Sequence, residues 1–378
     1  MTVDRRQTRE CEDMPFLGKL DKPKYVLDDM ARSLRYPSTR PANIGPGFLT
    51  CNVLTIDVED YFQVSGFEDV IPRSSWDQLE SRVERNTDRL LELLAEFRVR
   101  ATFFVLGWTA ERHPALVRRI QRAGHELGCH SYSHRLIYRL SDKDFREDTR
   151  RAKGIIEDLA GAKVIGYRAP SFSITRKSLW AITILAEEGF KYDSSIFPIF
   201  RDRYGIPGTP RFPYWLELKG ETVSNPLHER SWPTILEIPP TTVQWLGVTL
   251  PMGGGGYLRL CPSWAFHHAI RRLVEVKCQP AVVYLHPWEL DPEQPYIATA
   301  SWLSRFRHYV NLDGTEKKLR GLLSRWRFST AGELVDIICR TPITILDGLS
   351  IRGNSLTAQE RKSTCRTTPT PPSHPLTI

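Results

Sequence analysis

Short apolar segments alternate with longer amphipathic segments through the first half of the chain. The apolar segments predict strands, and the amphipathic segments, two of which end at a glycine, predict helices. The predicted strands are residues 52–56, 101–106, 125–129, 164–168, 192–193 and, further along, 281–285, and the predicted helices are residues 76–97, 115–123, 142–160 and 177–188. Because strands that alternate with helices pair in parallel, the sequence predicts an α/β protein with a parallel sheet or barrel.

Residues 200–260 interrupt this alternation, since they are rich in proline, glycine and aromatic residues. We expect short antiparallel strands and long loops there, including a strand at 235–238, and helices again at 261–275, 316–327 and 331–339. Residues 1–48 and 346–378 have few apolar residues in a regular pattern, which predicts a poorly ordered leader and a disordered tail. The expected organisation is a main domain over residues 49–290, with the 200–260 insertion inside it, followed by a helical extension over residues 291–345.

The composition is that of a soluble globular protein, with 41% hydrophobic residues among 378 and a net charge of +8. The seven cysteines include no C-x-x-C pair, the first residues form no signal peptide, and no apolar run is long enough to span a membrane. We therefore expect a cytoplasmic protein in a reducing compartment. Its positive charge is compatible with peripheral contact with a membrane surface or an acidic polymer, and no basic run interleaved with aromatics indicates a nucleic-acid partner.

Two histidines and an acidic cluster form the motif with the clearest chemistry. His130 and His134 are four residues apart, a spacing that places both imidazoles on one face of a helical turn, and Asp57, Glu59 and Asp60 follow a predicted strand. Two imidazoles and one carboxylate leave an open coordination position, which is typical of a catalytic metal site. The alternative is that the histidine spacing arises by chance and that the acids form an exposed turn.

Further polar residues follow the other predicted strands, where α/β barrels place their active sites. They are Arg168, Asp193 and His286, and each of them alone could equally be structural. Trp288, beside His286, is a candidate for stacking on a sugar ring. A zincin motif at His125-Glu126 is excluded because Cys129 stands where the second histidine belongs, and the glycines at 253–256 lack the Lys and Ser/Thr of a phosphate-binding loop.

The order of these motifs resembles that of the NodB-type polysaccharide deacetylases (carbohydrate esterase family 4). The resemblance extends over residues 52–289 and is carried by Asp57-Val-Glu-Asp60, His130-x3-His134, Arg168-x-Pro170, Tyr192-Asp193 and Leu285-His-x-Trp288. The extended forms Asp57-Val-Glu-Asp-Tyr-Phe62, Gly253-Gly-Gly-Gly-Tyr-Leu258 and Leu285-His-Pro-Trp-Glu-Leu290 are similar to one subfamily, which accompanies bacterial exopolysaccharide loci of the exosortase type and has a C-terminal extension.

The resemblance implies a distorted (β/α) barrel and one divalent metal, usually zinc. It implies that Asp57 is the general base, that His130 and His134 bind the metal, that Arg168 orients the base, and that His286 is the general acid supported by Asp193. Val58 stands where the family has its acidic metal ligand, so this ligand is expected from Glu59 or Asp60, with Glu59 favoured because it shares a strand face with Asp57. Contacts to substrate are expected from Trp288 and Pro170, and an oxyanion-stabilising backbone N–H from the region of Tyr61.

The implied activity is removal of N-acetyl groups, with release of acetate, from N-acetylhexosamine units of a bacterial exopolysaccharide or its lipid-linked precursor. One alternative is a C–N hydrolase of the same superfamily that acts on a non-sugar amide or a cyclic imide. A second is a non-catalytic carbohydrate-binding relic, although Asp57 and His286 are both retained. A third is a peptidoglycan deacetylase, which normally acts outside the membrane.

Overall fold

The computed structural model describes residues 52–201, 203–217 and 234–340 of the chain. All of them lie within one compact unit. The leader predicted at residues 1–48, the tail predicted at 346–378 and the last residues of the predicted helical extension lie outside the described residues.

A nine-stranded sheet forms the centre of the described region, in the order β10-β1-β2-β3-β4-β5-β7-β6 with β11 beside β1. All neighbours pair in parallel except β6 and β7, which are antiparallel. The strands are β1 (Asn52–Val58), β2 (Thr102–Val105), β3 (Glu126–Cys129), β4 (Gly166–Tyr167), β5 (Tyr192–Asp193), β6 (Tyr214–Glu217), β7 (Thr234–Glu237), β10 (Val282–Leu285) and β11 (Phe328–Ser329). The curled, mostly parallel sheet confirms the predicted distorted (β/α) barrel.

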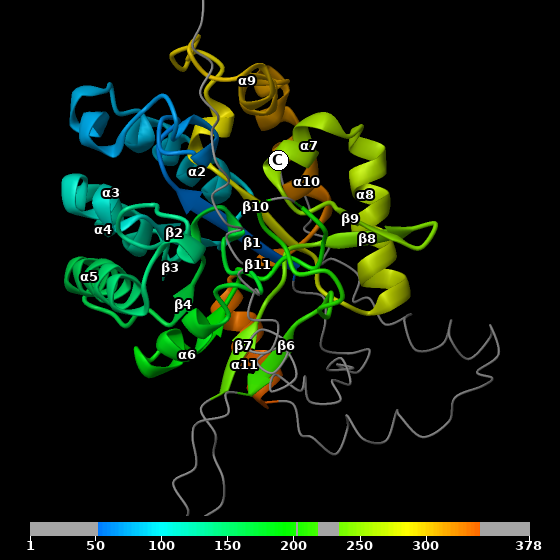
Figure 1. The fold of residues 1–378 in the computed structure, drawn as a ribbon. Coiled ribbons are helices and arrows are strands. Elements are labelled where there is room, and N and C mark those ends of the chain that lie inside the picture. Colours follow the sequence, from blue (N-terminus) through cyan, green and yellow to red (C-terminus); the bar gives the residue numbers. More distant parts are fainter. Residues whose placement is uncertain (1–51, 202, 218–233, 341–378) are drawn as a thin grey trace, which may run out of the picture. The chain divides into compact units, whose positions relative to one another are not determined.

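Helices follow most of the parallel strands and cover the sheet (Figure 1). Figure 1 shows α2 to α6 following one another along one side, and α7, α8 and α10 on the opposite side. The helices are α2 (Val83–Glu96), α3 (Gly107–Arg112), α4 (Pro114–Arg122), α5 (Asp142–Ala160), α6 (Trp180–Glu187), α7 (Gly255–Leu260), α8 (Ser263–Arg271), α9 (Trp302–Tyr309), α10 (Thr315–Arg325) and α11 (Ala331–Arg340).

The strand β1 is the second strand of the sheet, next to β10, and all seven of its residues are buried. It pairs with β10 on one side and β2 on the other, so Ile56 has Leu285 and Phe103 as its neighbours in the sheet. A strand that is covered on both faces has no need of alternating polar residues, which explains why it is a short, nearly continuous apolar run. Its burial fixes the direction in which Asp57 and the residues after it leave the sheet.

Some boundaries differ from those predicted. The helix expected at residues 76–97 begins at Val83, and its expected first turn belongs instead to a separate 3₁₀ segment, Arg73–Gln78. The glycine run at 253–256, expected to be a loop, enters α7 at Gly255. The insertion expected at 200–260 does contain an antiparallel hairpin, β8 (Thr242–Trp245) and β9 (Val248–Pro251).

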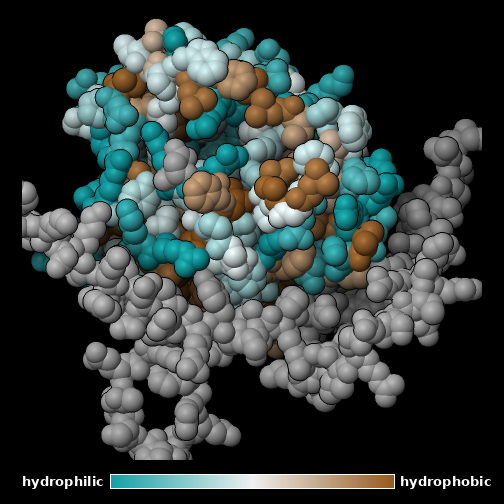
Figure 2. Space-filling view, turned by 45° about the vertical axis from the view of Figure 1, so that its right-hand side comes forward, coloured by the Kyte–Doolittle hydropathy of each residue, from teal (hydrophilic) through white to brown (hydrophobic). Residues whose placement is uncertain are grey.

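The hairpin carries several exposed apolar side chains, among them Trp245, Leu246 and Val248. Figure 2 shows a face of the molecule on which hydrophobic residues form separate groups between hydrophilic ones. No helix within the described ranges is both long and apolar enough to cross a bilayer.

Candidate metal centre and active site

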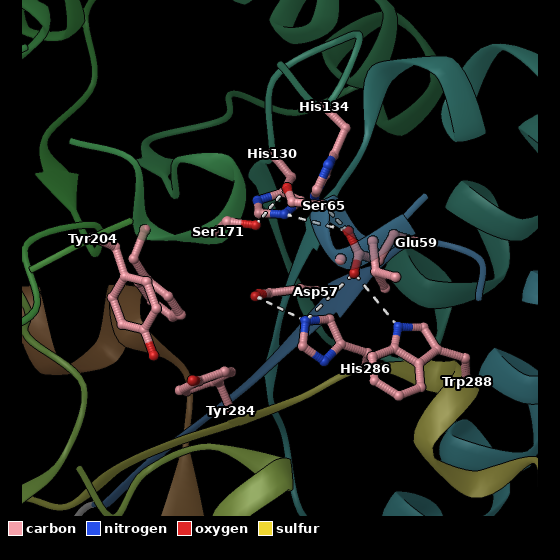
Figure 3. Close-up of a pocket in the computed structure, with 13 residues that line it drawn as sticks. Asp57, Glu59, Ser65, His130, His134, Ser171, Tyr204, Tyr284, His286 and Trp288 are labelled. Atoms are coloured by element: carbon pink, nitrogen blue, oxygen red, sulfur yellow. Dashed lines mark hydrogen bonds and ion pairs between the residues drawn. The ribbon is translucent and has the colours of Figure 1, made fainter. Parts of the chain in front are cut away.

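The carboxyl ends of β1, β3, β4 and β10 meet at one edge of the sheet and surround a cavity of about 220 Å³ (Figure 3). Parallel strands all end at the same edge, so polar residues that follow them in sequence are brought together. The residues that line the cavity are Asp57, Glu59, Val64, Ser65, Gly66, His130, His134, Ser171, Phe172, Tyr204, Tyr284, His286 and Trp288. The volume is below the roughly 300 Å³ at which pockets begin to enclose whole drug-sized ligands, so the cavity can admit one part of a larger molecule.

Glu59, His130 and His134 place three possible ligand atoms within 4.8 Å of one another. Glu59 Oε2 lies 2.6 Å from His134 Nε2 and 3.9 Å from His130 Nε2. All three side chains are buried, and Figure 3 shows both imidazoles turned toward the carboxylate.

These residues fit a divalent metal ion. Despite the short distance to His134, Glu59 Oε2 accepts no well-directed hydrogen bond within the described part of the chain. A buried carboxylate oxygen without a donor is costly, and a cation between the three groups would remove that cost. His130 Nδ1 lies 2.8 Å from the backbone oxygen of Arg168, an outer contact that leaves Nε2 as the ligand atom. Two histidines and one carboxylate are a common ligand set of catalytic zinc.

The charges in the cluster favour the metal-binding forms of its members. Burial opposes ionisation of Glu59, but the adjacent His134, His286 and His130 outweigh burial and lower the pKa of Glu59 to about 2. Burial lowers the pKa of His130 to about 4. Near neutral pH these two groups are therefore a carboxylate and a neutral imidazole, the forms that bind a metal.

The two histidines do not lie on a helical turn, contrary to the interpretation of their spacing. Residues 130–134 form a loop after β3, in which Ser131 and His134 have φ values of 68° and 50°. Non-glycine residues adopt this left-handed conformation rarely and at a cost of roughly 1 to 2 kcal/mol. The imidazoles are brought together by the fold of the loop and not by helical periodicity.

Side chains from two other elements hold this loop. Asp148 on α5 accepts hydrogen bonds from the backbone N–H groups of Tyr132 and Ser133, at 2.6 and 3.2 Å. Arg73 donates to the backbone oxygens of Ser133 and His134, at 2.7 and 2.9 Å. The position of the second imidazole thus depends on residues far away in the sequence.

Asp60, the other candidate for the acidic ligand, is occupied elsewhere. Its Oδ2 accepts hydrogen bonds from Ser81 Oγ and from the backbone N–H groups of Arg82 and Val83, at 2.7, 2.8 and 3.1 Å. Its Oδ1 accepts from the backbone N–H of Tyr61 at 3.0 Å. Asp60 therefore caps the start of α2, and the geometry leaves Glu59 as the carboxylate at the metal centre. The N–H of Tyr61 is also committed to Asp60 and does not serve as the expected oxyanion donor.

Asp57 is held by a fully buried arginine, in agreement with the expected role of Arg168. Arg168 Nη1 donates to Asp57 Oδ1 at 2.7 Å, while its Nε and Nη2 donate to the backbone oxygen and the hydroxyl of Ser194. This leaves Asp57 Oδ2 toward the cavity, 3.8 Å from His286 Nε2. The arginine thus fixes one oxygen of the carboxylate and leaves the other available.

His286 belongs to a chain of buried charged groups that the sequence did not reveal. Its Nδ1 lies 2.8 Å from Glu289 Oε1, and Glu289 Oε2 accepts from Arg259 Nε at 2.9 Å. Arg259, on α7, also donates to the backbone oxygens of His308 and Val310, each at 2.8 Å. Because Glu289 holds Nδ1, the Nε2 atom of His286 faces the cavity, 3.5 Å from Glu59 Oε1.

Glu289 and the acids of the cavity stabilise the charged form of His286. Burial by itself lowers the pKa of His286, but the hydrogen bond that His286 donates to Glu289 and the charges of Glu59, Glu289 and Asp57 raise it to about 9. The pKa of Glu289 is in turn lowered, because Arg259 and His286 together outweigh its burial. His286 is therefore protonated near neutral pH, as a general acid must be.

Asp193, expected to support His286, instead faces Glu237 across the pairing of β5 with β7. Its Oδ1 accepts a hydrogen bond from Ser195 Oγ at 2.5 Å, and Glu237 Oε1 accepts one from the N–H of Ile196. Burial raises the pKa of Asp193 to about 6, and burial together with the charge of Asp193 raises that of Glu237 well above its usual range. The two facing carboxylates thus order the segment that contacts Arg168.

Of the three expected substrate contacts, Trp288 lines the cavity, whereas Tyr61 and Pro170 are buried and do not. The Trp288 ring stacks between His286 and His308, with ring centroids 5.0 and 4.1 Å away. Its Nε1 donates to Glu59 Oε1 at 3.4 Å. Trp288 therefore orients both halves of the site and exposes little surface for stacking on a sugar.

The sequence reasoning also missed residues on the other wall of the cavity. Ser171 and Phe172 have positive φ values of 52° and 54°, and Ser171 Oγ donates to Ser65 Oγ at 2.7 Å. Tyr204 and Tyr284 complete this wall, and Figure 3 shows both on the side away from the two imidazoles. The position of Ser171 directly after the Arg-x-Pro motif is a sequence feature that could have indicated its place in the site. The sequence around Tyr204 contains no motif that indicates such a place.

Comparison with protein families gives two matches that together span most of the described region. Residues 71–191 match the model described as "Polysaccharide deacetylase", and residues 194–336 match the model described as "Domain of unknown function (DUF3473)". The two matches meet next to β5, within the single large sheet.

Individual relatives are similar to this chain over shorter segments. A peptidoglycan-N-acetylglucosamine deacetylase of Bacillus cereus is 35% identical over 96 residues, which are 25% of this chain and 35% of that protein. A peptidoglycan deacetylase of Helicobacter pylori is 34% identical over 110 residues, which are 29% of this chain and 36% of that protein. The chain thus spans about a third of the length of these relatives.

Among solved structures, a protein of Mycobacterium smegmatis assigned as a polysaccharide deacetylase superposes with a TM-score of 0.50. The match has 21% sequence identity and covers 82% of this chain and 95% of that one. At this identity the likeness shows a shared fold.

Proposed function

Because the chain carries a polysaccharide deacetylase domain joined to a DUF3473 domain, we propose that it is a metal-dependent N-deacetylase of N-acetylhexosamine units. The observation that carries the proposal is the position of the Glu59, His130 and His134 cluster between a carboxylate held by Arg168 and an imidazole held by Glu289. A possible base and a possible acid thus flank a possible metal site within one cavity.

Glu59, His130 and His134 would hold the metal. When bound, a divalent ion supplies Lewis-acid activation of water and of the amide carbonyl. Asp57 is the group placed to accept the proton of the attacking water, because Arg168 fixes its Oδ1 and leaves Oδ2 toward the cavity.

His286 is the group placed to protonate the leaving nitrogen. An amine leaves poorly as an anion, so the acid must deliver its proton while the C–N bond breaks. Glu289 fixes the tautomer through Nδ1, and the charged Nε2–H points into the cavity on the side opposite the imidazole ligands. The role first expected of Asp193 is thereby given to Glu289 and Arg259.

The proposal extends to the polymer that carries the N-acetylated unit. The retained acid and base argue against a non-catalytic relic, and the open cavity suits a unit within a longer chain. An exopolysaccharide or its lipid-linked precursor agrees with the net positive charge. Peptidoglycan is the second candidate, because the two relatives described above are named for that substrate.

The test measures acetate release by purified, zinc-loaded protein from N-acetylglucosamine oligomers and peptidoglycan fragments, and ring opening of a cyclic imide by the same protein. We expect acetate from the sugar substrates, and we expect Asp57→Asn to abolish it while metal content, measured by mass spectrometry, stays at one ion per chain. Hydrolysis of the imide alone would replace this proposal by the non-sugar alternative. Loss of the metal in Asp57→Asn would show that Asp57 is a ligand and not the base.

A further inference from the structure

A second cavity adjoins the active site, and its lining includes four cations. It is called the basic pocket here, and its lining consists of Tyr138, Thr175, Arg176, Lys177, Arg201, Arg203, Tyr204, Gly205 and Pro207. Four of these residues are cations and none is a carboxylate. Its volume of about 260 Å³ is similar to that of the active-site cavity.

The four cations are not neutralised by the described residues around them. Arg176 Nη2 donates to the backbone oxygen of Pro207 at 3.3 Å, and Arg201 Nη2 donates to Tyr257 Oη at 3.1 Å, both of them neutral partners. Neither these two residues nor Lys177 and Arg203 form an ion pair with a described carboxylate. Most other arginines of the sheet-covering helices have such partners, as Arg119 does with Glu84 and Asp88.

Two chain segments run from the active-site cavity into the basic pocket. The first segment begins in the active-site cavity with Ser171 and Phe172. It continues into the basic pocket with Thr175, Arg176 and Lys177. The second supplies Tyr204, which lines both cavities, and the Arg201 and Arg203 that flank it lie in the basic pocket. A substrate chain that places one unit over the metal centre can therefore place a neighbouring unit against these cations.

We propose that the basic pocket binds an oxyanion group, a carboxylate or a phosphate, carried by the substrate near the unit that is deacetylated. The inference rests on the proposed function and defines the substrate as an anionic N-acetylated glycan. Guanidinium groups match carboxylates and phosphates through paired hydrogen bonds, and a recess lined by one sign of charge concentrates the field on a ligand of opposite sign. Cations that serve only to keep a surface solvated are spread evenly over it. The four cations of the basic pocket instead surround one recess that shares a wall with the active site.

The experiment compares oligomers that differ in charge alone. Oligomers that alternate N-acetylglucosamine and glucuronate are used as the free acid and as the methyl ester, and N-acetylglucosamine oligomers are used with and without a phosphate. Acetate release gives kcat and KM, and calorimetry at low and high salt gives affinity independently of turnover. The proteins are wild type, Arg176→Ala/Lys177→Ala, and the control Arg118→Ala/Arg122→Ala, which removes two exposed cations from α4 on another part of the surface.

We expect wild type to have a KM about tenfold lower for an anionic oligomer than for its neutral counterpart, the size expected for two or three partly exposed ion pairs. The Arg176→Ala/Lys177→Ala variant should lose most of this preference, mainly through KM, and the control should keep it. Preference for the uronate or for the phosphate identifies the source of the oxyanion.

Equal KM values for charged and neutral oligomers in wild type, or a preference that survives in the pocket variant, would overturn the inference while leaving deacetylation intact. If no oligomer yields acetate, the proposed function fails, and calorimetry still decides the inference. In that case salt-sensitive, tighter binding of the anionic oligomer by wild type and not by the pocket variant supports it, and equal binding refutes it.

Discussion

One added methyl group at Gly255 should test whether Glu289 positions the proposed general acid. A Cβ at Gly255 would lie 2.3 Å from both carboxylate oxygens of Glu289, a distance that real side chains do not tolerate. A Cβ at the adjacent Gly256 would find its nearest neighbour, Arg259 Nη2, at 3.9 Å. Gly255→Ala and Gly256→Ala therefore make the same chemical change in the same helix. The new methyl group contacts Glu289 in Gly255→Ala and does not in Gly256→Ala.

The size of the effect follows from the distances. To reach ordinary contact the Glu289 carboxylate must move by about 1 Å, which would lengthen the 2.8 Å contact with His286 Nδ1 beyond hydrogen-bonding range. A hydrogen bond to a charged group contributes about 1.5 to 3 kcal/mol, and each 1.4 kcal/mol in the barrier is tenfold in rate. We expect Gly255→Ala to lower kcat for an N-acetylated sugar by roughly ten- to a hundredfold. Both variants gain the helix propensity of alanine, so the difference between them comes from the contact of the new methyl group with Glu289.

The assay uses two substrates that need the acid to different extents. Release of acetate from an N-acetyl sugar requires protonation of the nitrogen, whereas an aryl acetate ester loses a phenolate that leaves without help. Gly255→Ala should lose amide hydrolysis and keep most of the ester hydrolysis, and Gly256→Ala should retain both. Equal kcat values for the two variants on the amide, or equal losses on amide and ester, would refute the role of Glu289 as a positioning residue.

Three further predictions concern the metal centre, the start of α2 and pH. His134→Ala should reduce bound zinc from about one ion per chain to a small fraction, as elemental analysis would show, whereas retention of the ion would exclude His134 as a ligand. Asp60→Ala should leave the metal in place but lower the free energy of unfolding by about 2 kcal/mol, because four donors lose their acceptor. Asp60→Asn should recover part of the lost stability, and loss of metal in either variant would mean that Asp60 is a ligand. In metal-free protein the pKa of His286 is about 9 in the folded state and roughly 6.5 in the unfolded state. The stabilisation of the folded state by charged His286 is therefore fully present below pH of about 6.5 and is lost as the pH rises through 9. Denaturant unfolding should therefore show a decrease on the order of 3 kcal/mol over that range, absent in His286→Gln.

The sequence was informative wherever a residue's position followed from the end of a strand. Asp57, His130, Arg168 and His286 each end or follow a short apolar segment, and parallel pairing alone brings such residues to one edge. Strand parity also favoured Glu59 over Asp60, and the structure adds a separate reason, because Asp60 accepts hydrogen bonds from the start of α2. That cap also determines where α2 begins, which explains why the helix start was predicted several residues too early.

Contacts between distant segments could not be predicted in this way. The family resemblance assigned Asp193 to His286, but β5 is separated from β10 by most of the sheet, while Glu289 lies three residues after His286 on a 3₁₀ turn. Recognising Glu289 would have required knowing that Arg259 and Gly255 make room for a buried carboxylate. The loop between His130 and His134 likewise depends on Asp148, and no local pattern predicts its left-handed residues.

The buried strand β1 explains how the two family matches form one site. It lies before residue 71, outside both matches, and it pairs with β2 of the deacetylase match and with β10 of the DUF3473 match. The two imidazoles of the proposed metal site come from the first match, and the proposed acid with its Glu289 and Arg259 comes from the second. The proposed base and the carboxylate of the proposed metal site come from β1 and the residue after it. Since both sides of the cavity are set by the pairing of one buried strand, we infer that the DUF3473 region is an integral half of the catalytic unit and not an accessory domain.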